Sequence, residues 1–290
     1  MLLSGWPGTS DAEPLRRLDQ IKAALAAPKA ADMRAFAGQA PVRNGLLHRP
    51  SHAFPPGPPL AMPSFSTTYV RDGISFPLTV IGADPALGQT TIIPTVIFAY
   101  RLQLADGTVF DASSDVMDGV TPVQGVLSSP IFKSAPWTAG GVSLGVTQWS
   151  DAVMRANFWG RKADGYHVLL GMPTVKPITI DVPAAFGFSV VDPKSGEREA
   201  AIDGDWLFNL IIQVTQSPPG VPPTTLPIHL FSQVATAAFG HAISLGFHNA
   251  YAFTTPSGAT VAAPFIQAGW CQAALWPQTP GSLHMRSPSG

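Results

Sequence analysis

The chain of 290 residues contains few charged residues and a single cysteine. Charged residues make up 12% of the sequence, about half the usual share of ~25%. The 17 basic and 18 acidic residues give a net charge of −1, which leaves no excess positive charge to neutralise phosphates, so we expect no nucleic-acid partner. Cys271 alone excludes an intrachain disulfide and a cysteine-based zinc cluster.

Long apolar runs are also missing. No stretch approaches the roughly 18 apolar residues that cross a bilayer, so the sequence predicts no transmembrane segment. The N-terminus, MLLSGWPGTSDAEPLRRL, shows no basic region followed by an apolar region, and no signal peptide is visible. Low charge with abundant Ser, Thr, Pro and Gly is nevertheless typical of an exported protein.

Proline and glycine are present in excess. The 30 prolines and 27 glycines make up nearly a fifth of the chain, against a usual share of about 12%. Both residues interrupt helices, which excludes a helical bundle or coiled coil. Apolar residues reach 46%, enough for a core. We therefore predict an α+β chain with a β-dominated scaffold and a few short helices.

Three regions are expected along the chain. Residues 1–63 hold one amphipathic helix within 11–38 and a proline-rich linker, and we expect this region to be partly disordered. Residues 64–255 form a β-rich α+β domain. Residues 256–290 form an irregular tail, because from residue 262 onward they carry one charge and no clear period.

The central region contains several short elements. Strands are predicted over 65–71, 74–81, 91–104, 166–170, 178–182, 228–231 and 243–247, the first two joined by the hairpin dipeptide Asp72-Gly73. Helices are predicted over 123–134 and 148–159. The second helix is expected to turn Trp149, Val153, Ala156 and Trp159 towards the core and to expose Asp151 and Arg155.

Ser143 is the one nucleophile candidate. Residues 141–145 match G-x-S-x-G, the elbow that lifts a serine above the sheet of an α/β-hydrolase. That elbow requires a buried strand before the serine, and the preceding KSAPWTAG does not have the composition of one. We therefore favour a turn before the next helix, with Ser143 as a weak catalytic candidate.

His241 and His248 are weak metal-ligand candidates. They flank the predicted strand 243–247, and their seven-residue separation places them on opposite faces of a strand. That geometry is poor for one metal ion, so a structural role is preferred. The sequence contains no H-E-x-x-H, P-loop or G-x-G-x-x-G motif, and Asp192, Asp203 and Asp205 are expected in loops and turns. No cofactor is predicted for this chain.

Longer segments carry a resemblance. "VIGADPALGQTTIIPTVIFAYRLQLADGTVFD" (80–111), "LSSPIFKSAPWTAGGVSLGVTQWSDAVMRANFW" (127–159), "YHVLL" (166–170) and "LGFHNAY" (245–251) resemble a group of exported bacterial, acidobacteria-type proteins of uncharacterised activity. In that group a segment like "LSHEIAEWMDDP" follows the "YHNAY" strand. H-E-x-x-E on a helix places its first His and last Glu on one face, as in zinc-dependent peptidases. The resemblance implies an extracellular or periplasmic protein, with zinc in intact relatives.

This chain lacks that segment and ends in HMRSPSG. These residues and a stop codon can be encoded CAC ATG AGA TCG CCG AGT GGA TGA, and reading from the third base of the first codon gives H-E-I-A-E-W-M. Our hypothesis is that the reading frame slipped between residues 257 and 283. The C-terminal part would then be truncated or out of frame, and the chain inactive.

The function expected from the sequence is a truncated member of a secreted zincin-like, peptidase-like metalloprotein group. The alternative is a non-enzymatic extracellular β-rich module that binds glycan or protein. Six tryptophans, namely Trp137, Trp149, Trp159, Trp206, Trp270 and Trp276, would supply stacking surfaces for that alternative, although such residues also serve as core.

Overall fold

A computed structural model describes residues 58–191, 196–217, 220–238, 242–244 and 246–271. The predicted helix within 11–38, most of the N-terminal region, His241 and the tail beyond Cys271 lie outside the described residues.

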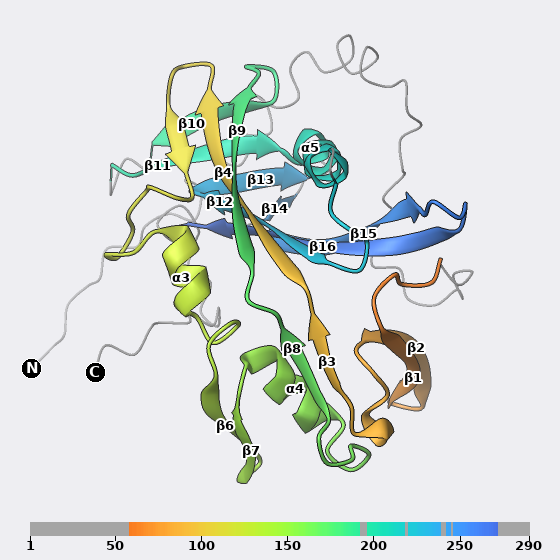
Figure 1. The fold of residues 1–290 in the computed structure, drawn as a ribbon. Coiled ribbons are helices and arrows are strands. Elements are labelled where there is room, and N and C mark those ends of the chain that lie inside the picture. Colours follow the sequence, from red (N-terminus) through yellow and green to blue (C-terminus); the bar gives the residue numbers. More distant parts are fainter. Residues whose placement is uncertain (1–57, 192–195, 218–219, 239–241, 245, 272–290) are drawn as a thin grey trace, which may run out of the picture.

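The described part of the chain is strand-dominated, which confirms the predicted β-rich α+β class (Figure 1). Its helices are α3 (Pro122–Ser128), α4 (Trp149–Asn157), α5 (Gly204–Gln216) and the short 3-10 helix η1 (Pro85–Leu87). Its strands are β1 (Ser64–Arg71), β2 (Ile74–Ile81), β3 (Thr90–Ile93), β4 (Thr95–Leu104), β5 (Val109–Asp111), β6 (Ala135–Ala139), β7 (Val142–Thr147), β8 (His167–Leu170), β9 (Thr174–Val182), β10 (Gly187–Val191), β11 (Arg198–Asp203), β12 (Leu226–Ser232), β13 (Val234–Ala238), β14 (Ala242–Ser244), β15 (Gly246–Thr254) and β16 (Thr260–Trp270).

The main sheet has six strands around a parallel centre. Strands β9, β4, β12 and β16 are parallel neighbours in that order, while β15 joins β16 and β5 joins β4 in antiparallel fashion. Strand β4 is buried at eight of its ten positions, because both faces of this sheet are covered. On one face Phe98, Tyr100 and Leu102 pack against α5 and a second sheet of order β10-β11-β13-β14. On the other face Ile97 and Ala99 pack against α3.

A narrow extension leaves the main sheet. Strand β3 runs into β4 through Pro94, and strand β8 precedes β9. Strands β3 and β8 pair in parallel beyond the N-terminal ends of β4 and β9. Helix α4 and the hairpins β6–β7 and β1–β2 lie around this extension in the lower half of Figure 1. A cluster of buried polar side-chain contacts lies in this extension.

Two local expectations are wrong, and one helix is not predicted from the sequence. Helix α4 has its faces reversed, because Asp151 and Ala152 are buried whereas Trp149 and Trp159 are 46% and 44% exposed. The apolar segment 206–214, for which the sequence predicts no element, is part of helix α5. Residues 260–270, expected to be irregular, form β16 in the interior of the main sheet, between β12 and β15. This strand lies between two other strands and both of its faces are covered. Its sequence, rich in Ala and with one Gly and one Pro, therefore shows no alternation of apolar and polar residues that would predict a strand.

Candidate functional site

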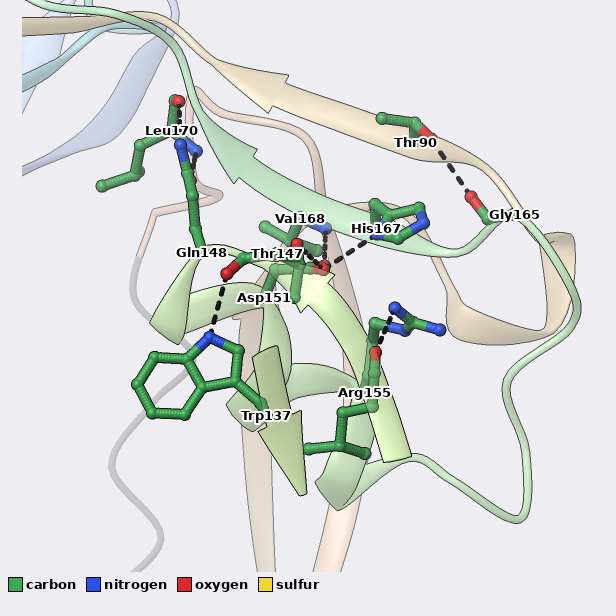
Figure 2. Close-up of polar contacts among 11 residues, drawn as sticks. Thr90, Trp137, Thr147, Gln148, Asp151, Arg155, Gly165, His167, Val168 and Leu170 are labelled. Atoms are coloured by element: carbon green, nitrogen blue, oxygen red, sulfur yellow. Dashed lines mark hydrogen bonds and ion pairs between the residues drawn. The ribbon is translucent and has the colours of Figure 1, made fainter. Parts of the chain in front are cut away.

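The polar centre of the extension is Asp151, in the first turn of α4. Its side chain is completely buried. Thr147 Oγ1 donates to Asp151 Oδ2 at 2.6 Å, His167 Nδ1 lies 2.8 Å from the same oxygen, and the backbone N–H of Val168 donates to Oδ1 at 2.7 Å (Figure 2). A carboxylate in the first turn also interacts favourably with the helix dipole. These contacts join β7, α4 and β8 at one buried group.

Gln148 binds the backbone of β8 two residues beyond the position that Asp151 binds. Its Oε1 accepts from the N–H of Leu170 at 2.7 Å, and its Nε2 donates to the Leu170 carbonyl at 2.9 Å. Val168 and Leu170 are alternate residues of β8 and therefore point their backbone groups to the same edge. The side chains of Asp151 and Gln148 thus take the place of a neighbouring strand and protect that edge of β8 from other partners.

The hairpin β6–β7 is fixed to this centre. Trp137 Nε1 donates to the carbonyl of Thr147 at 2.9 Å, and Arg155 NH1 donates to the carbonyl of Leu144 (Figure 2). On the opposite side, Thr90 Oγ1 donates to the carbonyl of Gly165 at 3.1 Å. The position of His167 is therefore determined by several independent contacts.

His167 is the reactive group that this arrangement presents. With Nδ1 directed at Asp151 and a side chain 32% exposed, its Nε2 has no hydrogen-bond partner among the described residues. An imidazole oriented in this way can accept a proton or contribute one metal ligand. Asp151 gives no hydrogen bond to a serine or cysteine, and within the described residues no group of three or more His, Cys, Asp or Glu could hold a metal ion. Among the described residues, the site therefore provides a single oriented imidazole.

A second polar group lies inside the main core. Tyr100 OH lies 2.9 Å from His229 Nδ1, and Thr215 Oγ1 lies 3.1 Å from His229 Nε2. Thr215 uses its only hydroxyl proton on the carbonyl of Ile211 at 2.7 Å. It must therefore accept from Nε2–H, which leaves Nδ1 to accept from the tyrosine hydroxyl. Burial lowers the pKa of His229 to about 3 and raises that of Tyr100, so this closed relay is neutral and structural.

The sequence-based candidates do not assemble into a site. Ser143 is an exposed residue of β7, two positions after the Gly140-Gly141 turn of a hairpin. This location is neither a nucleophile elbow nor a turn before a helix. His248 is exposed on β15, inside a strand instead of beside one. Asp203 caps α5 by accepting from the N–H of Trp206 at 2.8 Å, and Asp205 is exposed in its first turn.

The tryptophans divide between core and surface. Trp206 stacks on Phe186 with ring centroids 5.7 Å apart, and Trp270 lies against Gly125 of α3. Trp149 and Trp159 remain exposed, and the ammonium group of Lys162 lies 4.5 Å from the centre of the Trp159 ring.

No protein-family model, curated protein or solved structure matches this chain. Among the described residues, no helix has the length and apolar character needed to span a membrane.

Proposed function

We propose that this chain is a non-enzymatic binding module that recognises its partner with the β1–β2 hairpin. The observation that carries this proposal is the apolar face of the hairpin. Tyr69, Ile74, Phe76 and Leu78 lie on that face and are 53%, 56%, 43% and 45% exposed. A two-stranded hairpin is marginally stable alone, and exposed apolar patches of this kind mark interaction surfaces.

Only the base of the hairpin is packed. Phe65, on the same face, is buried edge-to-face against Phe158 with ring centroids 5.3 Å apart. Apart from Val70 and Pro77, the solvent-exposed residues of the opposite face are polar, among them Ser66, Thr68 and Thr79. The alternation of apolar and polar residues therefore directs four large side chains to one side without a neighbouring element among the described residues.

The chemistry of this face favours a protein partner over a glycan. Tyr69 and Phe76 lie side by side, with ring centroids 6.3 Å apart and planes 35° apart, and Ile74 and Leu78 continue the surface with branched aliphatic groups. Sugar binding needs several polar groups around a stacking ring. An apolar peptide face needs large side chains that lose solvent on contact.

The test is selection of a random peptide library displayed on phage against the full chain. We expect amphipathic peptides to be enriched. The double variant Phe76→Ser and Leu78→Ser should weaken their binding by about tenfold or more, because two central apolar contacts are lost. The control variant Thr68→Ala and Thr79→Ala alters the polar face and should bind as the wild type does. Absence of enriched peptides, or equal binding by the Phe76/Leu78 variant, would contradict the proposal.

The evolutionary origin proposed from the sequence is a secreted zincin-like group. The described residues do not fit a zinc site, as no metal-ligand cluster is found among them, so we derive no metal chemistry for this chain. The pairing of β16 up to Trp270 as an integral strand supports a change of reading frame after that residue, within the proposed interval 257–283. Sequencing the gene beyond codon 270 tests this: an open shifted frame encoding H-E-I-A-E-W-M supports the origin, and an immediate stop refutes it.

A further inference from the structure

Among the described residues, the outer edge of strand β15 has no partner strand, and its hydrogen-bonding pattern is defined. Within the described residues β15 pairs only with β16. Ala262 of β16 exchanges hydrogen bonds with the segment on its other side, accepting from Ala61 N at 3.0 Å and donating to Pro59 O at 2.8 Å. The backbone groups of Ala262 therefore point away from β15, and those of its register partner Ala252 point away from β16.

The alternation of strand geometry extends this direction to His248 and Ala250. These two residues and Ala252 thus present backbone N–H and C=O groups at the outer edge. The Ala250 N–H is met only by the side chain of the adjacent Asn249, at 2.8 Å.

This edge also lacks the features that prevent strand addition. Strand β15, with sequence GFHNAYAFT, contains no Lys, Arg, Asp, Glu or Pro. At the other side of the main sheet, β9 carries Lys176, Pro177 and Asp181, which are residue types that protect an edge. The two edge strands of the sheet therefore differ in these protective residues, and within the part of the chain that the structure describes β15 is the unprotected one.

We propose that a second copy of this chain adds to β15 in antiparallel fashion, about a two-fold axis at Ala250. This register places Ala250 opposite the partner subunit's Ala250 and His248 opposite the partner subunit's Ala252. Each of the three facing pairs centred on Ala250 contributes two backbone hydrogen bonds, about six in total.

The same register matches the side chains. Phe247 lies opposite the partner subunit's Phe253, and the symmetry repeats this pair on the other side of the axis. Both phenylalanines are only half-buried in the single chain, and cross-strand aromatic pairs stabilise antiparallel sheets.

The second copy is favoured over an unrelated strand for two reasons. The open backbone groups and the phenylalanines are both arranged symmetrically about Ala250, and a strand without charges meets no repulsion from its own copy. A two-fold contact of this kind uses both open edges, so assembly stops at the dimer. This inference does not depend on the partner of the β1–β2 hairpin.

The test is oxidative cross-linking of full-length chains in which Cys271 is replaced by Ser. Facing residues at such a pair have Cα atoms about 5.5 Å apart, within the ~4.4–6.8 Å range of a disulfide, so Ala250→Cys should yield covalent dimers. In the control Ala252→Cys, the two cysteines lie four residues apart along the strands, about 13 Å, and should cross-link at least about tenfold more slowly.

Analytical ultracentrifugation supplies a second readout. The parent chain should dimerise with a dissociation constant in roughly the micromolar range. Ala250→Pro should raise that constant by about tenfold or more, because it removes an outward N–H without touching the bonds to β16. Equal cross-linking at positions 250 and 252, or a chain that stays monomeric at high micromolar concentration, would overturn the proposal, including the case in which β15 binds only foreign peptides.

Discussion

At the scale of single residues, Asp151 shows how much depends on one buried carboxylate. A charged group removed from water is costly unless donors surround it. Thr147, His167 and Val168 supply three. The consequence is that α4 is attached to β7 and β8 through hydrogen bonds at its first turn, while its Trp149 faces solvent.

The substitution Asp151→Asn tests this attachment. The amide turns one acceptor into a donor that faces other donors, so we expect a loss of about 2–4 kcal/mol in the free energy of unfolding. Urea denaturation measures it. Asp205→Asn makes the same change at an exposed first-turn position and should stay within about 0.5 kcal/mol of wild type. Equal losses in the two variants would show that the buried carboxylate is dispensable.

Ser143 provides a second test at this scale. Its position on an exposed hairpin strand, with Oγ accepting only from the N–H of Gly145 at 3.2 Å, supplies no base to activate it. A fluorophosphonate probe should therefore leave the protein unlabelled, and Ser143→Ala should be as stable as wild type. Labelling that disappears in Ser143→Ala would instead establish a serine hydrolase.

At the scale of elements, the local sequence pattern predicts a strand correctly where one of its faces is exposed to solvent. Strands β1 and β2 and their Asp72-Gly73 turn, with φ of 52° and 75°, match the prediction from alternation and turn chemistry. Helix α5 was not recognised because an apolar segment covered by two sheets carries no clear polar face. The Asp151–His167 contact was not predictable either, since its members lie 16 residues apart and a first-turn aspartate is usually a solvent-exposed residue.

Strand β16 offers a test at this scale, because residues after 256 were expected to be irregular. Phe265 is fully buried, and its ring centroid lies 5.6 Å from that of Phe208 and 5.9 Å from that of Phe247. If the strand is part of the native sheet, Phe265→Ala should cost about 3–5 kcal/mol.

Thermal or urea unfolding measures that loss. Thr260→Ala, at the exposed first position of the same strand, serves as the control and should change stability by less than about 0.5 kcal/mol. Indistinguishable stabilities for Phe265→Ala and the control would return residues 260–270 to the irregular tail.

At the scale of the whole molecule, the Tyr100–His229–Thr215 relay connects β4, β12 and α5 through the core between the two sheets. Its neutral imidazole makes stability depend on pH. The pKa of His229 is about 3 in the folded chain and near 6.5 when unfolded. As pH falls below about 6.5, only the unfolded chain takes up this proton, so stability decreases until pH approaches 3.

Comparison with His229→Gln isolates that effect. Between pH 7 and pH 5 the wild-type protein should lose about 2 kcal/mol more unfolding free energy than the variant, as measured by urea denaturation. An NMR titration of wild-type protein provides a check that requires no variant to fold: the His229 imidazole should remain neutral at pH 5. A midpoint above pH 5 would show that the relay is open to solvent.

The position of β16 has a consequence for synthesis. This last described strand is inserted between β12 and β15, which precede it in the chain, and its pairing with β12 is parallel and non-local. A nascent chain that has not yet released residues 260–270 from the ribosome has two incomplete sheet edges and an uncovered core face. The central sheet therefore forms completely only after residues 260–270 have emerged, and the nascent chain needs protection from aggregation until then.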